Sequence, residues 1–410
     1  MGKQHHFTKF PGQINASYFV QSHICAADDF TQARVSEICK IIKLPLKKSN
    51  LSAVASFLQA CQSLENREPY FSWLYRNGGP LASQATVRKR LEAEGYFNLA
   101  FKGFSNCFDG QAAIFELSEK SVSLADGCTF FCSSPKAPVS VSDIKDDDSL
   151  AKEIKQSEAY LLILEETKEL NDFLEQHPFS IHGTIYNGGL RRKFNHGSLK
   201  SGGRFYPGYA NLPKQIVRSD RSMVKPRRLA TIDGESIAEV DLSAAFLSIL
   251  AAQSGQWWPE DVDDPYQLIP FVAAGKGDER DFAKVLVSSI VMKNGKLTKV
   301  PTSLRLYEPK KGEEYKRFRE IASTQTDKEL IGQIHGAYPF LSQPFNGQNV
   351  VFWESEVIAK TMWNAAQIGI PAYPLHDALF VRRRDAKQVQ GLMEGIFRDL
   401  LGYKPNTSIK

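Results

Sequence analysis

The stretch Glu235–Gly255, ESIAEVDLSAAFLSILAAQSG, changes character at Asp241. Before this aspartate, Ile237 and Val240 indicate a short strand, and after it the alanines, leucines and isoleucines favour a helix. We expect Ser243 to cap that helix, because a serine at a helix start accepts a backbone N–H. A carboxylate where a strand meets a helix can hold a divalent cation. An Asp-x-Ser sequence is equally typical of a capped turn, so both interpretations stand.

A second segment, Glu279–Met292, ERDFAKVLVSSIVM, predicts a helix. One face of it would carry Arg280, Lys284, Ser288 and Met292, which recur every four residues. Two cations one turn apart can neutralise charge on the phosphates of a nucleotide. The alternative is an ordinary solvated basic stripe.

A third segment, Gly369–Arg384, GIPAYPLHDALFVRRR, contains two apolar runs, Ala372–Leu375 and Ala378–Val381. They flank His376 and Asp377, so the pattern predicts a hairpin with this pair at its turn. Taken alone, a His-Asp pair is as typical of a hydrogen-bonded turn as of a functional site.

The order of these segments resembles that of the A-family DNA polymerases, the family of DNA polymerase I. That family carries an Asp-x-Ser strand–helix motif, then an Arg-x-x-x-Lys helix motif, then a His-Asp hairpin. The matching residues here are Asp241-Leu242-Ser243, Arg280 with Lys284, and His376-Asp377. Upstream, Gly203-Arg204 resembles the segment with which the family touches the primer–template minor groove. The likeness runs from about residue 202 to 403, and the compact size suits a polymerase of a phage, a plasmid or another mobile element.

The resemblance implies two-metal nucleotidyl transfer. Asp241 and Asp377 would hold two Mg²⁺ ions, for which Mn²⁺ can substitute, and these would activate the primer 3′-hydroxyl and stabilise the leaving pyrophosphate. Arg280 and Lys284 would grip the triphosphate, and Lys284 would also donate a proton to the leaving group. His376 would contact the primer terminus or orient the hairpin.

A basic stretch precedes these motifs. Between Arg191 and Arg228 there are eleven Lys or Arg residues and a single acid, Asp220. Such a stretch is a solvated face or a phosphate-binding surface. On the resemblance, it would follow the backbone of primer–template DNA independently of its sequence. The predicted contacts are Arg204, Lys214, Arg218, Arg221, Lys225, Arg227 and Arg228.

The chain also departs from the family. Phe246 stands where many bacterial members have Glu; it either excludes a 2′-hydroxyl by contact with the sugar or is a core residue. Ser288 and Met292 replace aromatic residues of the second motif, which leaves Ser288 as a smaller nucleotide contact. Ala378 replaces a Glu that often follows His-Asp, a residue that single-subunit RNA polymerases also lack.

These observations predict a template-dependent DNA polymerase that extends a primer 3′-OH with dNTPs. Residues 1–135 offer no Asp-x-Glu pair in suitable surroundings, so we expect no proofreading exonuclease. One alternative is a primase or an enzyme like the single-subunit RNA polymerases, which would use ribonucleotides. Another is a non-catalytic DNA-binding protein with a degenerate palm.

The predicted fold class is α+β, a right-hand palm, fingers and thumb with a smaller N-terminal α/β domain. Residues 1–135 would form an accessory, nucleic-acid-binding domain, in which Ser83–Phe97 indicates a Ser-capped helix with basic residues on one side. Residues 136–148 would be a linker. A long helix over residues 150–176 would belong to a thumb-like helical region, 149–200, and residues 201–410 would form palm and fingers.

Bulk properties agree with a globular protein. The chain has 410 residues, 42% of them hydrophobic, and a net charge of +5. No apolar run reaches the roughly 18 residues of a membrane span, and the N-terminus lacks a secretory pattern, so we expect a cytoplasmic monomer that binds no membrane. A replication or mobile-element protein is a candidate partner. The six cysteines have no zinc-site spacing and are expected to be buried thiols.

Overall fold

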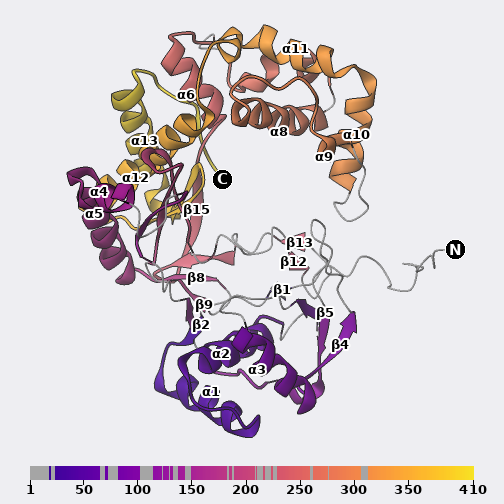
Figure 1. Cartoon of the computed structure of the whole chain (residues 1–410), viewed down its shortest axis with the longest axis vertical. Helices are drawn as coiled ribbons and strands as arrows, with labels where there is room; N and C mark the ends of the chain where they lie inside the picture. The colour runs from indigo at the N-terminus through magenta and orange to yellow at the C-terminus, as the bar shows by residue number, and fades with distance from the viewer. Residues whose placement is uncertain are drawn as a thin grey trace, which may run out of the picture. The chain divides into compact units, whose positions relative to one another are not determined.

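The computed structural model describes residues 18–19, 24–64, 70–72, 82–101, 114–121, 123–128, 130–132, 137–143, 149–181, 184–186, 189–207, 209, 216–217, 223–224, 229–258, 262–275, 277–305 and 313–410. Helices and strands are mixed along these residues, which confirms the predicted α+β class (Figure 1). The chain divides into two compact units. Unit 1 consists of residues 1–136, 171–190 and 207–237, and unit 2 of residues 137–170, 191–206 and 238–410.

These units differ from the predicted division of the chain. The expected N-terminal domain, residues 1–135, supplies most of unit 1, but the chain returns to that unit twice. Inside the predicted linker 136–148, Val139–Val141 form strand β7, which pairs with another strand. The region 149–200, predicted to be helical, is helical only as far as Glu175 and continues as strands.

Unit 1 contains helices α1 (Asp29–Ile41), α2 (Lys48–Leu64) and α3 (Ala82–Ala93) and the 3₁₀ turn η1 (Glu119–Ser121). One sheet has the order β1 (Tyr18–Phe19), β3 (Tyr70–Ser72), β5 (Ile114–Leu117), β4 (Phe97–Phe101). Further strands follow the order β14 (Thr231–Ile232), β8 (Phe179–Ile181), β9 (Thr184–Ile185), β6 (Phe130–Cys132), β2 (Ile24–Ala26). A short ribbon pairs β12 (Ile216–Val217) with β13 (Met223–Val224).

The core of unit 1 is apolar and closely packed around Phe57. Its ring centroid lies 6.0 Å from that of Tyr96 and 5.7 Å from that of Phe97. The cysteines whose side chains are described here, Cys39, Cys61 and Cys128, are buried free thiols as expected, and burial raises the pKa of Cys39 to about 11. These thiols serve packing, since a raised pKa suppresses the reactive thiolate.

The predicted basic helix of unit 1 exists with different limits. It begins at Ala82, so Ser83 lies inside the helix and is not its cap. It ends at Ala93, and Phe97 already begins strand β4.

Unit 2 is built on two sets of strands. The second half of β15 (Glu235–Leu242) neighbours β17 (Ala378–Arg382), which pairs with β16 (Ala372–Leu375), and β18 (Thr407–Ile409) runs antiparallel to β15. The other sheet has the order β11 (Ser198–Phe205), β10 (Arg192–Asn195), β7. The predicted hairpin is confirmed: Leu375 pairs with Ala378, which leaves His376 and Asp377 as its turn.

Helices cover these strands. The first group is α4 (Ser149–Gln156), α5 (Glu158–Glu175), α6 (Ala245–Ser254), α12 (Gly347–Gln367) and α13 (Ala386–Leu401). The second is α7 (Pro270–Ala273), α8 (Asp278–Met292), α9 (Thr302–Arg305), α10 (Glu313–Thr324) and α11 (Asp327–Ala337). Short 3₁₀ turns are η4 (Pro265–Leu268), η6 (Pro339–Ser342) and η7 (Arg383–Asp385). Among the residues that the structure describes, no helix has the length and apolarity to cross a membrane.

In the second group α10 packs against α8 and α9 (Figure 1), and α11 packs against α7. The apolar face of α8 closes this contact, because the Phe282 ring lies 5.9 Å from the Phe318 ring of α10. The opposite face of α8 carries Arg280, Lys284 and Ser288, as the sequence predicts, and is left partly or fully exposed. Packing on one side therefore turns this face away from the core.

The structure corrects two helix predictions, the cap of α6 and the single helix over residues 150–176. Helix α6 begins at Ala245, and its N-cap residue Ala244 is left-handed, with φ 49° and no side-chain cap. Ser243 does not cap it; its backbone N–H donates to the Asn406 carbonyl at 2.9 Å. The predicted single helix over 150–176 is two helices, because Ser157 ends α4 and its Oγ accepts the Tyr160 N–H at 3.3 Å, capping α5.

Helix α12 lies directly on β11, and two glycines permit the contact. Gly202 and Gly203 have φ values of 80° and 84°, in the left-handed region that favours glycine. Ser355 Oγ of α12 donates to the Gly202 carbonyl at 2.9 Å. A Cβ at Gly203 would lie 2.7 Å from Ser355 Oγ and 2.9 Å from the Phe194 ring. The residue after these glycines, Arg204, is thereby brought onto α12.

Replacing Gly203 by alanine should therefore destabilise the protein. We expect a loss of about 2–5 kcal/mol, from left-handed backbone strain of about 1–2 kcal/mol and overpacking of about 1–3 kcal/mol. The control is Gly402→Ala, because Gly402 has φ 73° but a Cβ added there would meet no atom within 4 Å. Urea unfolding midpoints measure both; equal losses would show that the approach of α12 adds nothing.

Candidate active site

Two carboxylates from distant parts of the chain meet in unit 2. Asp241 lies at the end of β15 and Asp377 in the β16–β17 turn, and the Leu242 N–H donates to the Asp377 carbonyl at 2.9 Å. Burial raises the pKa of Asp377, and the negative charge of Asp241 raises it further. His376, beside them, is exposed and has φ 55°. The backbone thus holds two like charges close together, an arrangement that a cation would stabilise.

Cations from other elements already face this pair. The charges of Lys284 and Arg204 both act to lower the pKa of Asp377. Lys410 Nζ lies 2.6 Å from Asp241 Oδ2 and 3.7 Å from Glu239 Oε1. Burial alone would lower the pKa of Lys410, but its hydrogen bond to Asp241 and the surrounding acids raise it. The ammonium group is therefore charged at neutral pH and offsets the negative charge of Asp241.

The donor set fits a hard divalent cation. Mg²⁺ is usually bound by one or two carboxylates and completes its shell with water and substrate phosphates. Asp241 and Asp377 supply two carboxylates, and the cationic Nζ on Asp241 marks a position where positive charge is favoured. No group of three or more His, Cys, Asp or Glu side chains suited to a metal occurs within the described ranges.

Arg204 is held by an acid rather than left free. Its Nε and Nη2 donate to the two carboxylate oxygens of Glu354 at 2.6 and 2.9 Å. The Glu354 side chain is 2% exposed, and burial raises its pKa to about 7 although Arg204 acts against this rise. The guanidinium carbon of Arg204 lies 5.6 Å from the centroid of the half-buried Phe246 ring. The pair orients Arg204 beside Phe246 and Asp377.

Arg280 is oriented in the same way. Its Nε and Nη2 donate to Asp264 at 2.6 and 3.3 Å, and its guanidinium lies 5.3 Å from the Tyr266 ring centroid. Burial raises the pKa of Tyr266, and the negative charge of Asp377 adds to this rise. The Tyr338 hydroxyl donates to the Pro265 carbonyl and anchors this turn. Arg280 thus lies over a fixed turn near the carboxylates.

One turn further along α8, Lys284 is exposed. Ser288 Oγ donates to the Lys284 carbonyl at 2.8 Å, so its hydroxyl is turned toward its own helix. Met292 is 41% exposed at the end of the same face. The predicted triphosphate-binding face is therefore open to a ligand at Lys284.

The other predicted DNA contacts cannot be placed. Lys214, Arg218, Arg221, Lys225, Arg227 and Arg228 lie outside the described residues. They remain predictions.

The sequence did not predict a role for three residues of this site, Glu354, Asp264 and Lys410. Glu354 had a readable signal, since it is an acid among the buried Val350, Val351, Val357 and Ile358 of α12, and buried acids are normally paired. Asp264 had a partial signal, because Asp-Pro at a helix start predicts the cap that it makes to the Tyr266 N–H. No local sequence pattern indicates the contact of Asp264 with Arg280 or the contact of Lys410 with Asp241.

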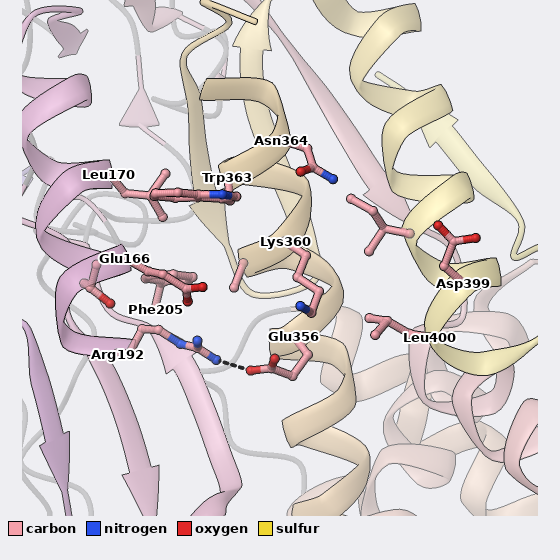
Figure 2. A pocket seen from close by; sticks show the side chains of 13 residues that line it. Glu166, Leu170, Arg192, Phe205, Glu356, Lys360, Trp363, Asn364, Asp399 and Leu400 are labelled. Atoms are coloured by element: carbon pink, nitrogen blue, oxygen red, sulfur yellow. Dashed lines mark hydrogen bonds and ion pairs between the residues drawn. The ribbon is translucent and has the colours of Figure 1, made fainter. Parts of the chain in front are cut away.

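A separate cavity of about 300 Å³ lies between α5, α12 and α13 (Figure 2). Trp363 and Leu170 form part of its apolar wall, and Arg192 Nη2 donates to Glu356 Oε1 at 2.7 Å within it. Burial raises the pKa of Glu166 in this cavity, while Arg192 and Lys360 oppose the rise. None of the candidate active-site residues lines it.

A scan against known protein families and a search of curated proteins found no match to this chain.

Replacing Arg204 by methionine tests the buried pair. We expect a loss of about 3 kcal/mol at pH 8, because removing one partner leaves the Glu354 carboxylate buried and uncompensated. A raised pKa makes the folded state bind protons more readily than the unfolded chain, so stability falls as pH rises through the folded pKa. The variant should regain stability between pH 8 and 6 more steeply than the wild type. Urea unfolding at these pH values measures this.

The double variant Arg204→Met with Glu354→Gln is the control. It has no carboxyl group to titrate, so the added pH dependence should vanish. An Arg204→Met profile parallel to the wild type would show that Arg204 does not neutralise Glu354.

Proposed function

We propose that this protein is a template-dependent DNA polymerase that extends a primer 3′-OH with dNTPs, on a right-hand fold. The palm is β15 with the β16–β17 hairpin, and α8 to α11 are the fingers. The observation that carries the proposal is the meeting of Asp241 and Asp377, where the Leu242 N–H donates to the Asp377 carbonyl at 2.9 Å, with Lys284 and Arg204 near enough for their charges to act on Asp377. These four residues come from the four motifs whose order resembles the A-family polymerases.

The chain's own groups have distinct tasks in this reaction. Arg280 and Lys284 bind the triphosphate, and each neutralises charge as the bond to the leaving pyrophosphate lengthens. Asp264 fixes the Arg280 guanidinium in advance, so less side-chain freedom is lost on binding. Lys284, exposed on α8, donates a proton to the pyrophosphate.

Asp241 and Asp377 would hold Mg²⁺, which would supply charge neutralisation at the primer hydroxyl and at the leaving pyrophosphate. The backbone holds the two carboxylates in register, because the hydrogen bond from the Leu242 N–H to the Asp377 carbonyl ties the end of β15 to the β16–β17 turn. Arg204, oriented by Glu354, faces the minor groove of the primer terminus, and His376 contacts the terminal nucleotide.

Phe246 sets the sugar preference. Its ring is half-buried next to the Arg204 guanidinium, close to the group around Asp377. A bulky ring there leaves no room for a 2′-hydroxyl, which favours dNTPs. The alternative of a primase or RNA polymerase-like enzyme predicts incorporation of NTPs, and a degenerate binding protein predicts none of either.

Primer extension on a labelled primer–template tests the activity. Asp377→Asn and Asp241→Asn should each lower the rate about 1,000-fold or more, because each removes a carboxylate that supports several kcal/mol of charge stabilisation. Binding of the primer–template should change little. Asp172→Asn, an exposed acid on α5, is the matched control and should extend normally.

Full extension by Asp377→Asn would refute the carboxylate assignment. Salt-sensitive DNA binding by the wild type with no extension by dNTPs or NTPs would favour the binding protein.

Phe246→Ala tests the sugar gate. It should raise NTP incorporation relative to dNTP by at least about tenfold, since a steric contact with one small group discriminates by about 10–200-fold. Phe246→Tyr retains the ring and should stay selective. Single-nucleotide extension with each substrate gives the ratio, and an unchanged ratio in Phe246→Ala would make Phe246 a packing residue.

A further inference from the structure

Lys410 reaches Asp241 because of strand register. Strand β18 pairs with β15 so that Ser408 lies opposite Asp241 and Ile409 opposite Val240. Glu239 and Lys410 then exchange both backbone hydrogen bonds, at 3.1 and 2.9 Å. Lys410 and Asp241 are therefore diagonal neighbours on one face of the sheet, a distance that a long side chain spans.

The segment that carries Lys410 is anchored on both sides. Thr407 Oγ1 donates to Glu394 Oε1 at 2.6 Å and accepts from Gln390 Nε2 at 2.9 Å, both on α13. The Asn406 side chain donates to the Asp263 carbonyl at 2.9 Å. Upstream, the Tyr403 ring stacks on Trp257 with centroids 4.0 Å apart. This anchoring keeps the ammonium group at the site.

We propose that Lys410 is a built-in counter-ion that competes with divalent cations for Asp241. The ammonium group and a metal ion repel each other when both lie against the Asp241 carboxylate, so metal binding favours displacement of Lys410. The side chain is 53% exposed and can swing into solvent while β18 stays paired. Lys410 thus sets the metal concentration at which the site fills. Before a metal binds, its positive charge reduces the repulsion between the Asp241 and Asp377 carboxylates.

The size of the effect follows from the strength of the ion pair. A fully exposed ion pair shifts an equilibrium by at most about fivefold, but the Asp241 side chain is only 17% exposed, and charges interact more strongly where less water surrounds them. The apparent affinity for the metal is the intrinsic affinity multiplied by the fraction of molecules in which Lys410 has left Asp241. Removing the competing charge should therefore tighten metal binding roughly three- to tenfold.

This inference rests on the proposed metal site, and the experiment separates the two. Mn²⁺ binding to the full chain, without DNA or nucleotide, is measured by electron paramagnetic resonance of free Mn²⁺ at low ionic strength. Lys410→Met, which keeps most of the side-chain stem, should bind Mn²⁺ about three- to tenfold more tightly than the wild type. The difference should shrink at high salt, which screens exposed charges.

Two variants serve as controls. Lys410→Arg keeps the charge and should remain near the wild type. Lys404→Met loses an equal charge from the same segment, but Lys404 pairs with Glu394 at 3.2 Å, so its Mn²⁺ affinity should stay within about twofold.

The outcomes are distinct. If Asp241→Asn abolishes Mn²⁺ binding but Lys410→Met binds no more tightly than the wild type, competition by Lys410 is refuted and the metal site stands. If the wild type binds no Mn²⁺, or Asp241→Asn binds as well as the wild type, the metal site itself fails and the inference fails with it.

Discussion

Asp241 and Asp377 repel each other, and the backbone holds them together in spite of this. The Leu242–Asp377 hydrogen bond joins the end of β15 to the hairpin turn, so neither carboxylate can withdraw without breaking the sheet. The raised pKa of Asp377 expresses this repulsion together with burial. Strand pairing thus stabilises a concentration of charge that would be unfavourable by itself, a feature typical of functional sites.

Helix α12 supports the site from one side. Its buried face packs on β11, where Gly202 and Gly203 let the backbones approach, and the same contact places Glu354 against Arg204. A buried acid contributes little net stability even when paired, and its removal alone would be costly. Its value here lies in orientation, because a bidentate pair fixes the guanidinium plane. Asp264 does the same for Arg280.

The elements that could be predicted from the sequence are those whose signal is local. The hairpin turn at His376-Asp377 was found because apolar runs flank it, and α8 because its charges recur every four residues. Ser157 was missed because one serine barely alters a helical pattern, although its hydroxyl can end one helix and cap the next. Strand β7, Val139–Val141, lies inside the predicted linker and was missed because it takes its stability from pairing with β10, which lies far along the chain.

The candidate site divides in the same way. Its carboxylates and the basic face of α8 sit in recognisable motifs, whereas the partners Asp264, Glu354 and Lys410 are set by tertiary structure. Those partners change the physical interpretation of the motifs. The sequence alone would describe Arg204, Arg280 and Lys284 as free cations awaiting phosphate, but both arginines are already bound by carboxylates.

The remaining charge balance determines what the site can accept. Asp241, Asp377, Glu239, Glu354 and Asp264 face Arg204, Arg280, Lys284 and Lys410, so the group is close to neutral before any ligand arrives. A triphosphate alone would meet the carboxylates, and a divalent cation alone would meet Lys410. A nucleotide that arrives with its cation brings both charges together, satisfying the carboxylates with the metal and Lys284 with the phosphates. On the proposed function, this arrangement would favour the metal–nucleotide complex over either component alone.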